Sequence, residues 1–314
     1  MHKDLNRSIL QTLAYFNIFN LPLTKEELYR WLFFYKHNFK TDYIDFLEFL
    51  DEYTEDASWQ TKGGYYFLPG CEKDIAKRET GIRLIEKKMK IARRAVRKLR
   101  YIPFVKAVFV CNTVAALSAS EDSDIDVFII TKKNRLYLAR IMVTLAMSIF
   151  RLRRTKKRIK DKICLSFYVS EDSLNLASIK IDDPDIYLMY WLDQLIPVYD
   201  PNDFLMNIFQ KNSWAKKFLP HAFEEYNLSN RWRVDDNKIS NAIKKLSEKI
   251  WQGSYGDMME AQAKSMQQAK MKMNFMSVQG EEDSRVIIND KMLKFHENDR
   301  RAEYRERWLD SVAQ

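Results

Sequence analysis

The sequence predicts an α+β fold in which helices flank a β-sheet. Three short runs rich in apolar and β-branched residues, 105–110, 125–130 and 163–169, are each bounded by polar or turn-forming residues, a pattern typical of strands. Apolar residues spaced three and four apart in 72–100 and 136–152 predict helices before and between these strands. The sheet should therefore lie in the middle of the chain.

Length and composition indicate a folded chain of several parts. Its 314 residues suffice for two or three small domains, and 46% hydrophobic and 13% aromatic residues can build proper cores. No P-loop, Gly-x-Gly-x-x-Gly or Ser-His-Asp signature is present. We expect four parts: a first domain at 1–70, a long basic connecting helix at 71–103, a core at 104–180 and a helical domain at 181–314.

The first part is predicted to contain three helices and a hairpin. Helical patterns cover 5–16 and 42–53, and Thr24 with Glu27 forms a capping-box pattern that begins a helix between them. Two aromatic-rich runs around Gly63 and Gly64 predict the hairpin, and the whole resembles a winged helix. The third helix is acidic and lacks Lys and Arg, so a protein contact is favoured over DNA binding and transcription regulation.

Basic residues concentrate in two segments, the helix at 72–100 and the run at 151–162. With a net charge of +9, the chain should attract polyanions. Each segment has two interpretations, a solvated surface or an electropositive wall beside a phosphate-binding site.

Two aspartates mark the best candidate site. In a strand, Asp124 and Asp126 project from the same side, while Ile125 and Val127 turn into the core. Carboxylates so placed can hold a hard divalent cation such as Mg²⁺, or Mn²⁺ in its place. The alternative is a pair of solvated aspartates at the mouth of the strand.

The segment before this pair carries a resemblance to a known family. An apolar strand, the polar turn Asn112–Thr113, Ala115, and then Ser123-Asp124-Ile125-Asp126 entering a second strand resemble the nucleotidyltransferase superfamily, the fold of DNA polymerase beta and the kanamycin nucleotidyltransferases. In that family a Gly-Ser pair holds the nucleotide phosphates, and the strand that follows bears two metal-binding acids. The resemblance implies a mixed sheet flanked by helices.

The resemblance also assigns roles and exposes departures. It implies that Asn112, Thr113 and Ser123 contact phosphates and that Asp124 and Asp126 bind Mg²⁺ or Mn²⁺. Asn112 replaces the family's glycine, but Asn tolerates the left-handed backbone conformation that such a turn needs.

A third acid is expected on a later strand, for which 163–169 is the candidate. Alternation along it puts Cys164, Ser166 and Tyr168 on one face, so Ser166 stands where the acid should be. Three alternatives stay open: the third acid is dispensable, Glu171 or Asp172 reaches in from the strand end, or the site has kept binding and lost catalysis.

The implied function is transfer of a nucleotidyl group from an NTP such as ATP to an acceptor hydroxyl, with RNA or another polyanion as a candidate acceptor. The alternative is a catalytically degenerate nucleotide- or nucleic-acid-binding protein. Charged residues at 293–301 are interpreted as a cap on a terminal helix. Because no apolar run is long enough to span a bilayer and the three cysteines lack metal-ligand spacing, we expect a cytoplasmic protein without membrane contact.

Overall fold

A six-stranded mixed sheet forms the centre of the computed structural model, which describes residues 2–34, 41–52, 58–224, 230–274, 277–279, 281 and 283–313. The strand order is β7-β4-β5-β6-β9-β8. Only β5 and β6 pair in parallel; the other neighbours are antiparallel. The strands are β4 (Val105–Val110), β5 (Ile125–Thr131), β6 (Ile163–Ser170), β7 (Ile196–Tyr199), β8 (Val286–Ile288) and β9 (Met292–Phe295). The α+β class and the three predicted strands are confirmed.

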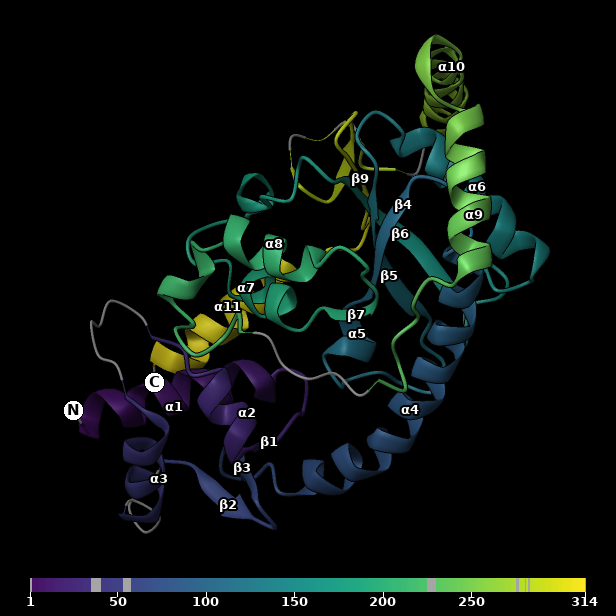
Figure 1. The fold of residues 1–314 in the computed structure, drawn as a ribbon. Helices are drawn as coiled ribbons and strands as arrows, with labels where there is room; N and C mark the ends of the chain where they lie inside the picture. Colours follow the sequence, from purple (N-terminus) through teal and green to yellow (C-terminus); the bar gives the residue numbers. More distant parts are fainter. Residues whose placement is uncertain are drawn as a thin grey trace.

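Helices cover both faces of this sheet (Figure 1). On one face, α4 (Lys73–Leu99) and α6 (Leu136–Ile149) bury Met89, Val96 and Met147 against the inward residues of β4 and β5. On the other face, α7 (Ile186–Asp193) and α8 (Phe204–Lys211) pack in a second core that includes Phe128. Burial of apolar side chains on both faces explains why the central strands are almost continuously hydrophobic.

The C-terminal part is not purely helical, which corrects the sequence prediction. Strands β7, β8 and β9 come from it and extend the sheet on both edges. They are only three or four residues long, too short for a period-two pattern to stand out. Helices nevertheless make up most of the regular structure described in this part: α7, α8, α9 (Lys238–Ile250), α10 (Gly253–Lys272) and α11 (Arg301–Ala313).

The N-terminal unit has the three predicted helices and the predicted hairpin, together with a short third strand that was not predicted. Helices α1 (His2–Asn17), α2 (Lys25–Arg30) and α3 (Tyr43–Glu52) are joined by a small sheet of order β1-β3-β2. The short strands of this sheet are β1 (Leu23–Thr24), β2 (Gln60–Lys62) and β3 (Tyr65–Phe67). Thr24 and Glu27 form the predicted capping box, and the turn at Gly63 and Gly64 has positive φ at both residues. Tyr53, the last residue of the predicted third helix, lies outside the described residues.

This unit shares one continuous apolar core with the C-terminal helices. Tyr15 of α1 stacks on Tyr190 of α7 with ring centroids 4.4 Å apart, and Trp308 of α11 donates its indole N–H to the Gln11 carbonyl at 2.9 Å. The first and last segments of the chain therefore lie side by side, next to α7 (Figure 1).

The apolar stripe of the long helix α4 is buried only where the helix crosses the sheet. Met89, Val96 and Leu99 are buried, whereas Ile82 from the same predicted stripe is 57% exposed. Among the described residues, no helix combines the length and the apolar character that crossing a bilayer requires.

Candidate active site

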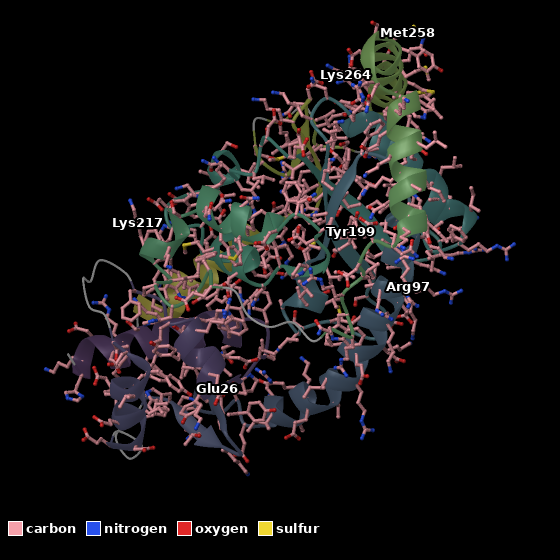
Figure 2. The ribbon with its side chains drawn as sticks, in the orientation of Figure 1. Glu26, Arg97, Tyr199, Lys217, Met258 and Lys264 are labelled. Carbon is pink, nitrogen blue, oxygen red and sulfur yellow. The ribbon has the colours of Figure 1, made fainter. Side chains whose placement is uncertain are left out.

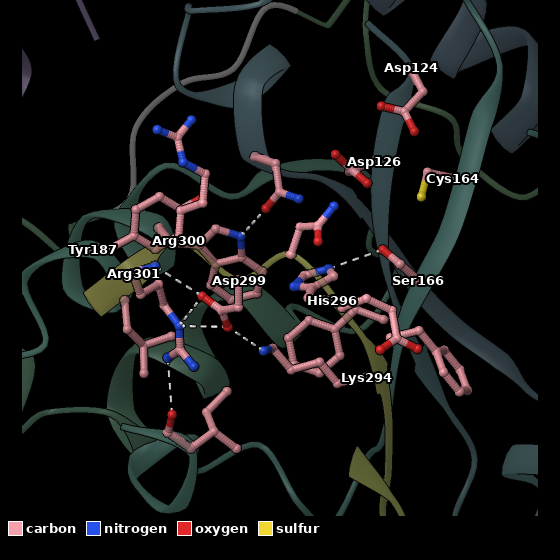
Figure 3. Close-up of a pocket in the computed structure, with 18 of the residues that line it drawn as sticks. Asp124, Asp126, Cys164, Ser166, Tyr187, Lys294, His296, Asp299, Arg300 and Arg301 are labelled. Atoms are coloured by element: carbon pink, nitrogen blue, oxygen red, sulfur yellow. Dashed lines mark hydrogen bonds and ion pairs between the residues drawn. The ribbon is translucent and has the colours of Figure 1, made fainter. Parts of the chain in front are cut away.

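The two aspartates lie at the start of β5 and share one cavity. Asp124 precedes the strand and Asp126 is its second residue, while Ile125 and Val127 are buried on the opposite face against α4 and α6. The predicted same-side arrangement is thus confirmed, because both carboxylates line a cavity of about 420 Å³ (Figure 3).

A cysteine joins the carboxylates. Cys164 of β6 is the register partner of Asp126, and the ligand atoms of Asp124, Asp126 and Cys164 all lie within 4.8 Å of one another. Burial and the neighbouring charge of Asp124 raise the pKa of Asp126 to about 6, although hydrogen bonds from Cys164 and Asn112 oppose the rise. Burial and both carboxylates raise the pKa of the Cys164 thiol, which therefore stays protonated at neutral pH.

An arginine from the basic run reaches this cluster. The Nε atom of Arg154 lies 2.8 Å from Oδ2 of Asp124, and its Nη1 atom lies 3.6 Å from the Cys164 sulfur. Arg154 reaches Asp124 because an isolated β-bridge between Arg153 and Ile163 holds the basic run beside the start of β6. The sequence showed the charge of this segment but not which of its cations meets the aspartates.

The turn after β4 has the predicted left-handed conformation. Asn112 has φ of 54°, and it begins the short helix α5 (Asn112–Ala115). Trp191 of α7 donates its indole N–H to the Asn112 side-chain oxygen at 2.8 Å, which fixes the amide in the cavity wall. The Asn112 side chain thus lines the cavity while its backbone keeps the left-handed conformation.

A second cavity adjoins the first at this turn. It has a volume of about 280 Å³, and Asn112, Thr113 and the cations Lys77, Arg300 and Arg307 contribute to its lining. Five residues line both cavities: Asn112, Tyr187, Trp191, Arg300 and Tyr304. Cations pair with phosphates and aromatic faces stack on bases, so the second cavity has the chemistry of a nucleotide pocket.

The position predicted for a third acid is occupied by a hydrogen-bonded serine. The Oγ atom of Ser166 lies 3.1 Å from Nε2 of His296, and burial lowers the pKa of that histidine to about 3, helped by Lys294. The predicted alternation holds from Ile163 to Ser166 and fails from Phe167 onward. The β5–β6 register shifts after Asp126, so Ser166 and Phe167 both line the cavity while Tyr168 packs on the opposite face.

Neither acid at the end of β6 reaches the site. Because β5 and β6 are parallel, Glu171 and Asp172 follow the strand end at which Thr131 pairs with Ser170, far from Asp126. Glu171 accepts a hydrogen bond from the Lys133 amide at 3.1 Å, and Asp172 forms an ion pair with the Lys133 ammonium at 3.2 Å. The alternative in which one of them completes the site is therefore wrong.

Ser123 lies outside the residues that line the two cavities. Its hydroxyl donates to the Ser120 carbonyl at 2.9 Å, and its own carbonyl accepts from the buried Lys88 ammonium at 2.7 Å. The predicted phosphate contact has no support in this position. Ser123 instead ties the loop before β5 to α4.

The segment between β9 and α11 caps the terminal helix as predicted, because Asp299 accepts a hydrogen bond from the Arg301 amide at 3.1 Å. The same segment also forms the wall opposite the aspartates, which was not predicted. Asp299 forms ion pairs with Lys294 at 2.8 Å and with Arg301 at 2.9 Å, and Arg301 reaches Asp185 at 2.9 Å (Figure 3). Burial would raise the pKa of Asp299, but Arg301 and Lys294 outweigh it and hold the pKa at about 2. This buried network fixes the backbone that carries His296 and Arg300 into the cavity.

Comparisons of the chain with protein families, with curated proteins and with solved structures find no match.

Proposed function

We propose that this protein is a metal-dependent nucleotidyltransferase that transfers a nucleotidyl group from an NTP to an acceptor hydroxyl. The observation that carries the proposal is the pair Asp124 and Asp126 in a cavity that continues, past the Asn112–Thr113 turn, into a second cavity lined by cations and aromatic rings. The proposal includes a nucleotidyltransferase-type core after a winged-helix-like N-terminal unit.

The donor set fits a hard divalent cation. Asp124 and Asp126 offer carboxylate oxygens, the ligands that Mg²⁺ and Mn²⁺ prefer, while the Cys164 thiol is a soft donor that suits neither. When bound there, the cation would supply positive charge that stabilises the phosphoryl group during transfer.

The chain's own residues would orient the reactants. Lys77, Arg300 and Arg307 neutralise the phosphates of the leaving group, and Thr113 offers a hydroxyl at the turn. Tyr187 and Tyr304, whose rings stack with centroids 5.7 Å apart, offer apolar faces beside the base. The acceptor hydroxyl oxygen attacks the α-phosphorus, its proton passes to water, and the bond from the α-phosphorus to the pyrophosphate oxygen breaks.

The acceptor is proposed to be RNA or another polyanion. Exposed cations of α4 and of residues 151–162 lie together, because Lys87 pairs with Asp161 at 2.8 Å and Lys98 lies 4.9 Å from the centre of the Phe150 ring. This basic surface begins at Arg154, next to Asp124, so a polyanion bound along it would extend to the carboxylates. A protein contact through the acidic α3 remains an expectation.

The test is pyrophosphate release from NTPs with Mg²⁺ or Mn²⁺ and a panel of acceptors that includes total RNA. The double variant Asp124→Asn/Asp126→Asn should abolish release. Glu121→Gln/Asp122→Asn is the matched control, because it removes the same charge from two exposed acids just before the pair and should leave release unchanged. Release retained by the aspartate double variant would refute the assignment.

A second candidate, a nucleotide-binding protein without catalysis, is favoured by two observations. Arg154 already neutralises Asp124, and Ser166 stands where the third acid was expected. This candidate predicts nucleotide binding that depends on Mg²⁺, measured by calorimetry, without pyrophosphate release for any acceptor.

A further inference from the structure

Helix α9 turns its apolar side chains to solvent. Four aliphatic side chains on it are largely exposed: Ile239 (64%), Ile243 (44%), Leu246 (64%) and Ile250 (59%). At 100° per residue these four fall within about 60° of one another and form one stripe along the helix, here called the α9 stripe. A surface helix of a globular protein normally turns such a stripe toward the core.

The side of α9 that packs on the protein is polar instead. Ser240 is fully buried and donates to Asp236 at 2.9 Å, the Lys244 ammonium donates to the Tyr199 hydroxyl at 2.7 Å, and Glu248 accepts from the Phe104 amide at 2.9 Å. Rotating the α9 stripe inward would break all three contacts and leave buried polar groups without hydrogen-bond partners. The outward orientation is therefore built into the fold.

The exposed polar residues beside the stripe are basic. Lys238, Lys245 and Lys249 are exposed on the remaining side of the helix, and the only acid in α9, Glu248, faces the protein. Beyond the helix, Tyr255 and Met258 are also exposed. Figure 2 shows Met258 past one end of α9 and Arg97 of α4 near the other, on the same margin of the molecule.

We propose that α9 docks this protein on a membrane surface that contains anionic lipids. The α9 stripe would insert between the lipids at the headgroup level, and the three lysines would contact the negative headgroups. A second copy is disfavoured as the occupant, because it would bring lysines against lysines in a chain of net charge +9.

This proposal departs from the prediction of no membrane contact. That prediction considered only bilayer-spanning runs, and a helix that lies in the surface needs none. The proposal does not depend on the nucleotidyltransferase assignment, because α9 supplies no residue to either cavity described above.

The test is co-sedimentation of the full chain with vesicles at physiological salt. One set is phosphatidylcholine alone, and in the other about a third of the lipid is phosphatidylserine. The wild type should pellet with the anionic vesicles only. Ile243→Ser/Leu246→Ser should weaken this binding by about tenfold or more. The matched control Ile44→Ser/Ile82→Ser, at exposed sites on α3 and α4, should bind like the wild type.

Two further measurements test the role of the lysines and the folding of the stripe variant. Lys245→Glu/Lys249→Glu should also lose binding to the anionic vesicles, which supports the role of the lysines. Thermal midpoints of the stripe variant should match the wild type, because the replaced side chains are exposed. The proposal is overturned by a wild type that binds no vesicles, by equal loss in the control variant, or by a wild-type dimer that the stripe variant abolishes.

Discussion

Replacing Asp126 by Asn should stabilise the folded protein at alkaline pH in the absence of metal. The pKa of Asp126 rises from 3.8 to about 6 in the folded state, because burial and Asp124 disfavour its charged form. At about 1.36 kcal/mol per pKa unit this shift is worth about 3 kcal/mol, and partial solvent access to Asp126 reduces the figure to about 2 kcal/mol. Asn has nearly the same shape and carries no charge, so it removes this cost.

The sign of the pH dependence follows from the raised pKa. At pH 8, well above the folded-state pKa of about 6, the carboxyl is ionised in both the folded and the unfolded state, and the wild type carries the full cost. As pH falls from about 6 toward 4, the folded state takes up the proton first and the cost disappears. The stabilising effect of Asp126→Asn should therefore be present at pH 8 and almost absent near pH 4.

The assay is thermal and urea unfolding with EDTA at both pH values. A gain of about 2 kcal/mol corresponds to a rise in Tm of about 3–4 °C for a chain of this size. The control Asp122→Asn replaces an exposed acid of the same loop, and it should change neither the free energy of unfolding nor the Tm. Adding Mg²⁺ or Mn²⁺ should stabilise the wild type but not the variant, and so reduce the difference in Tm between the two proteins. A variant that is no more stable than the wild type at pH 8, or one whose gain is independent of pH, would refute the reasoning.

Three other substitutions test separate contacts. Arg154→Gln removes the cation that competes for Asp124 and should raise the affinity for Mn²⁺ by about threefold to tenfold in a calorimetric titration; unchanged or weaker affinity would argue against competition. Trp191→Phe removes the hydrogen bond to Asn112 and should cost about 1 kcal/mol of stability in urea while weakening NTP binding. Normal NTP affinity in Trp191→Phe would show that NTP binding does not require the hydrogen bond from Trp191 to the Asn112 side chain. Asp193→Ala should cost about 3–5 kcal/mol, because the buried carboxylate accepts from Arg30, Trp31 and the Phe223 amide; a loss below about 1 kcal/mol would contradict this.

The sequence predicted the parts of the fold that depend on local pattern. The strands β4, β5 and β6 are apolar on both faces, and their flanking polar residues mark the ends. The same-side placement of Asp124 and Asp126 followed from the two-residue period of a strand. The left-handed turn at Asn112 followed from what an Asn backbone tolerates.

The rest depends on contacts between segments distant in the chain. The approach of Arg154 to Asp124 is set by how residues 151–162 return to β6, and no local pattern encodes it. The register shift in β6 broke the predicted alternation, and only the pairing with β5 reveals it. The cavity wall at 296–301 is held by Asp299 between Lys294 and Arg301, charges that in sequence resemble a solvated helix end.

The central claim is that Asp124 and Asp126 hold a divalent cation beside a bound nucleotide. The most direct measurement is a crystal structure of the full chain with Mn²⁺ and a non-hydrolysable NTP analogue, using the anomalous signal of manganese. We predict a manganese peak bound by both carboxylates, with Arg154 displaced from Asp124 and the triphosphate at the Asn112–Thr113 turn. Manganese bound elsewhere, or a nucleotide outside the two joined cavities, would contradict the account.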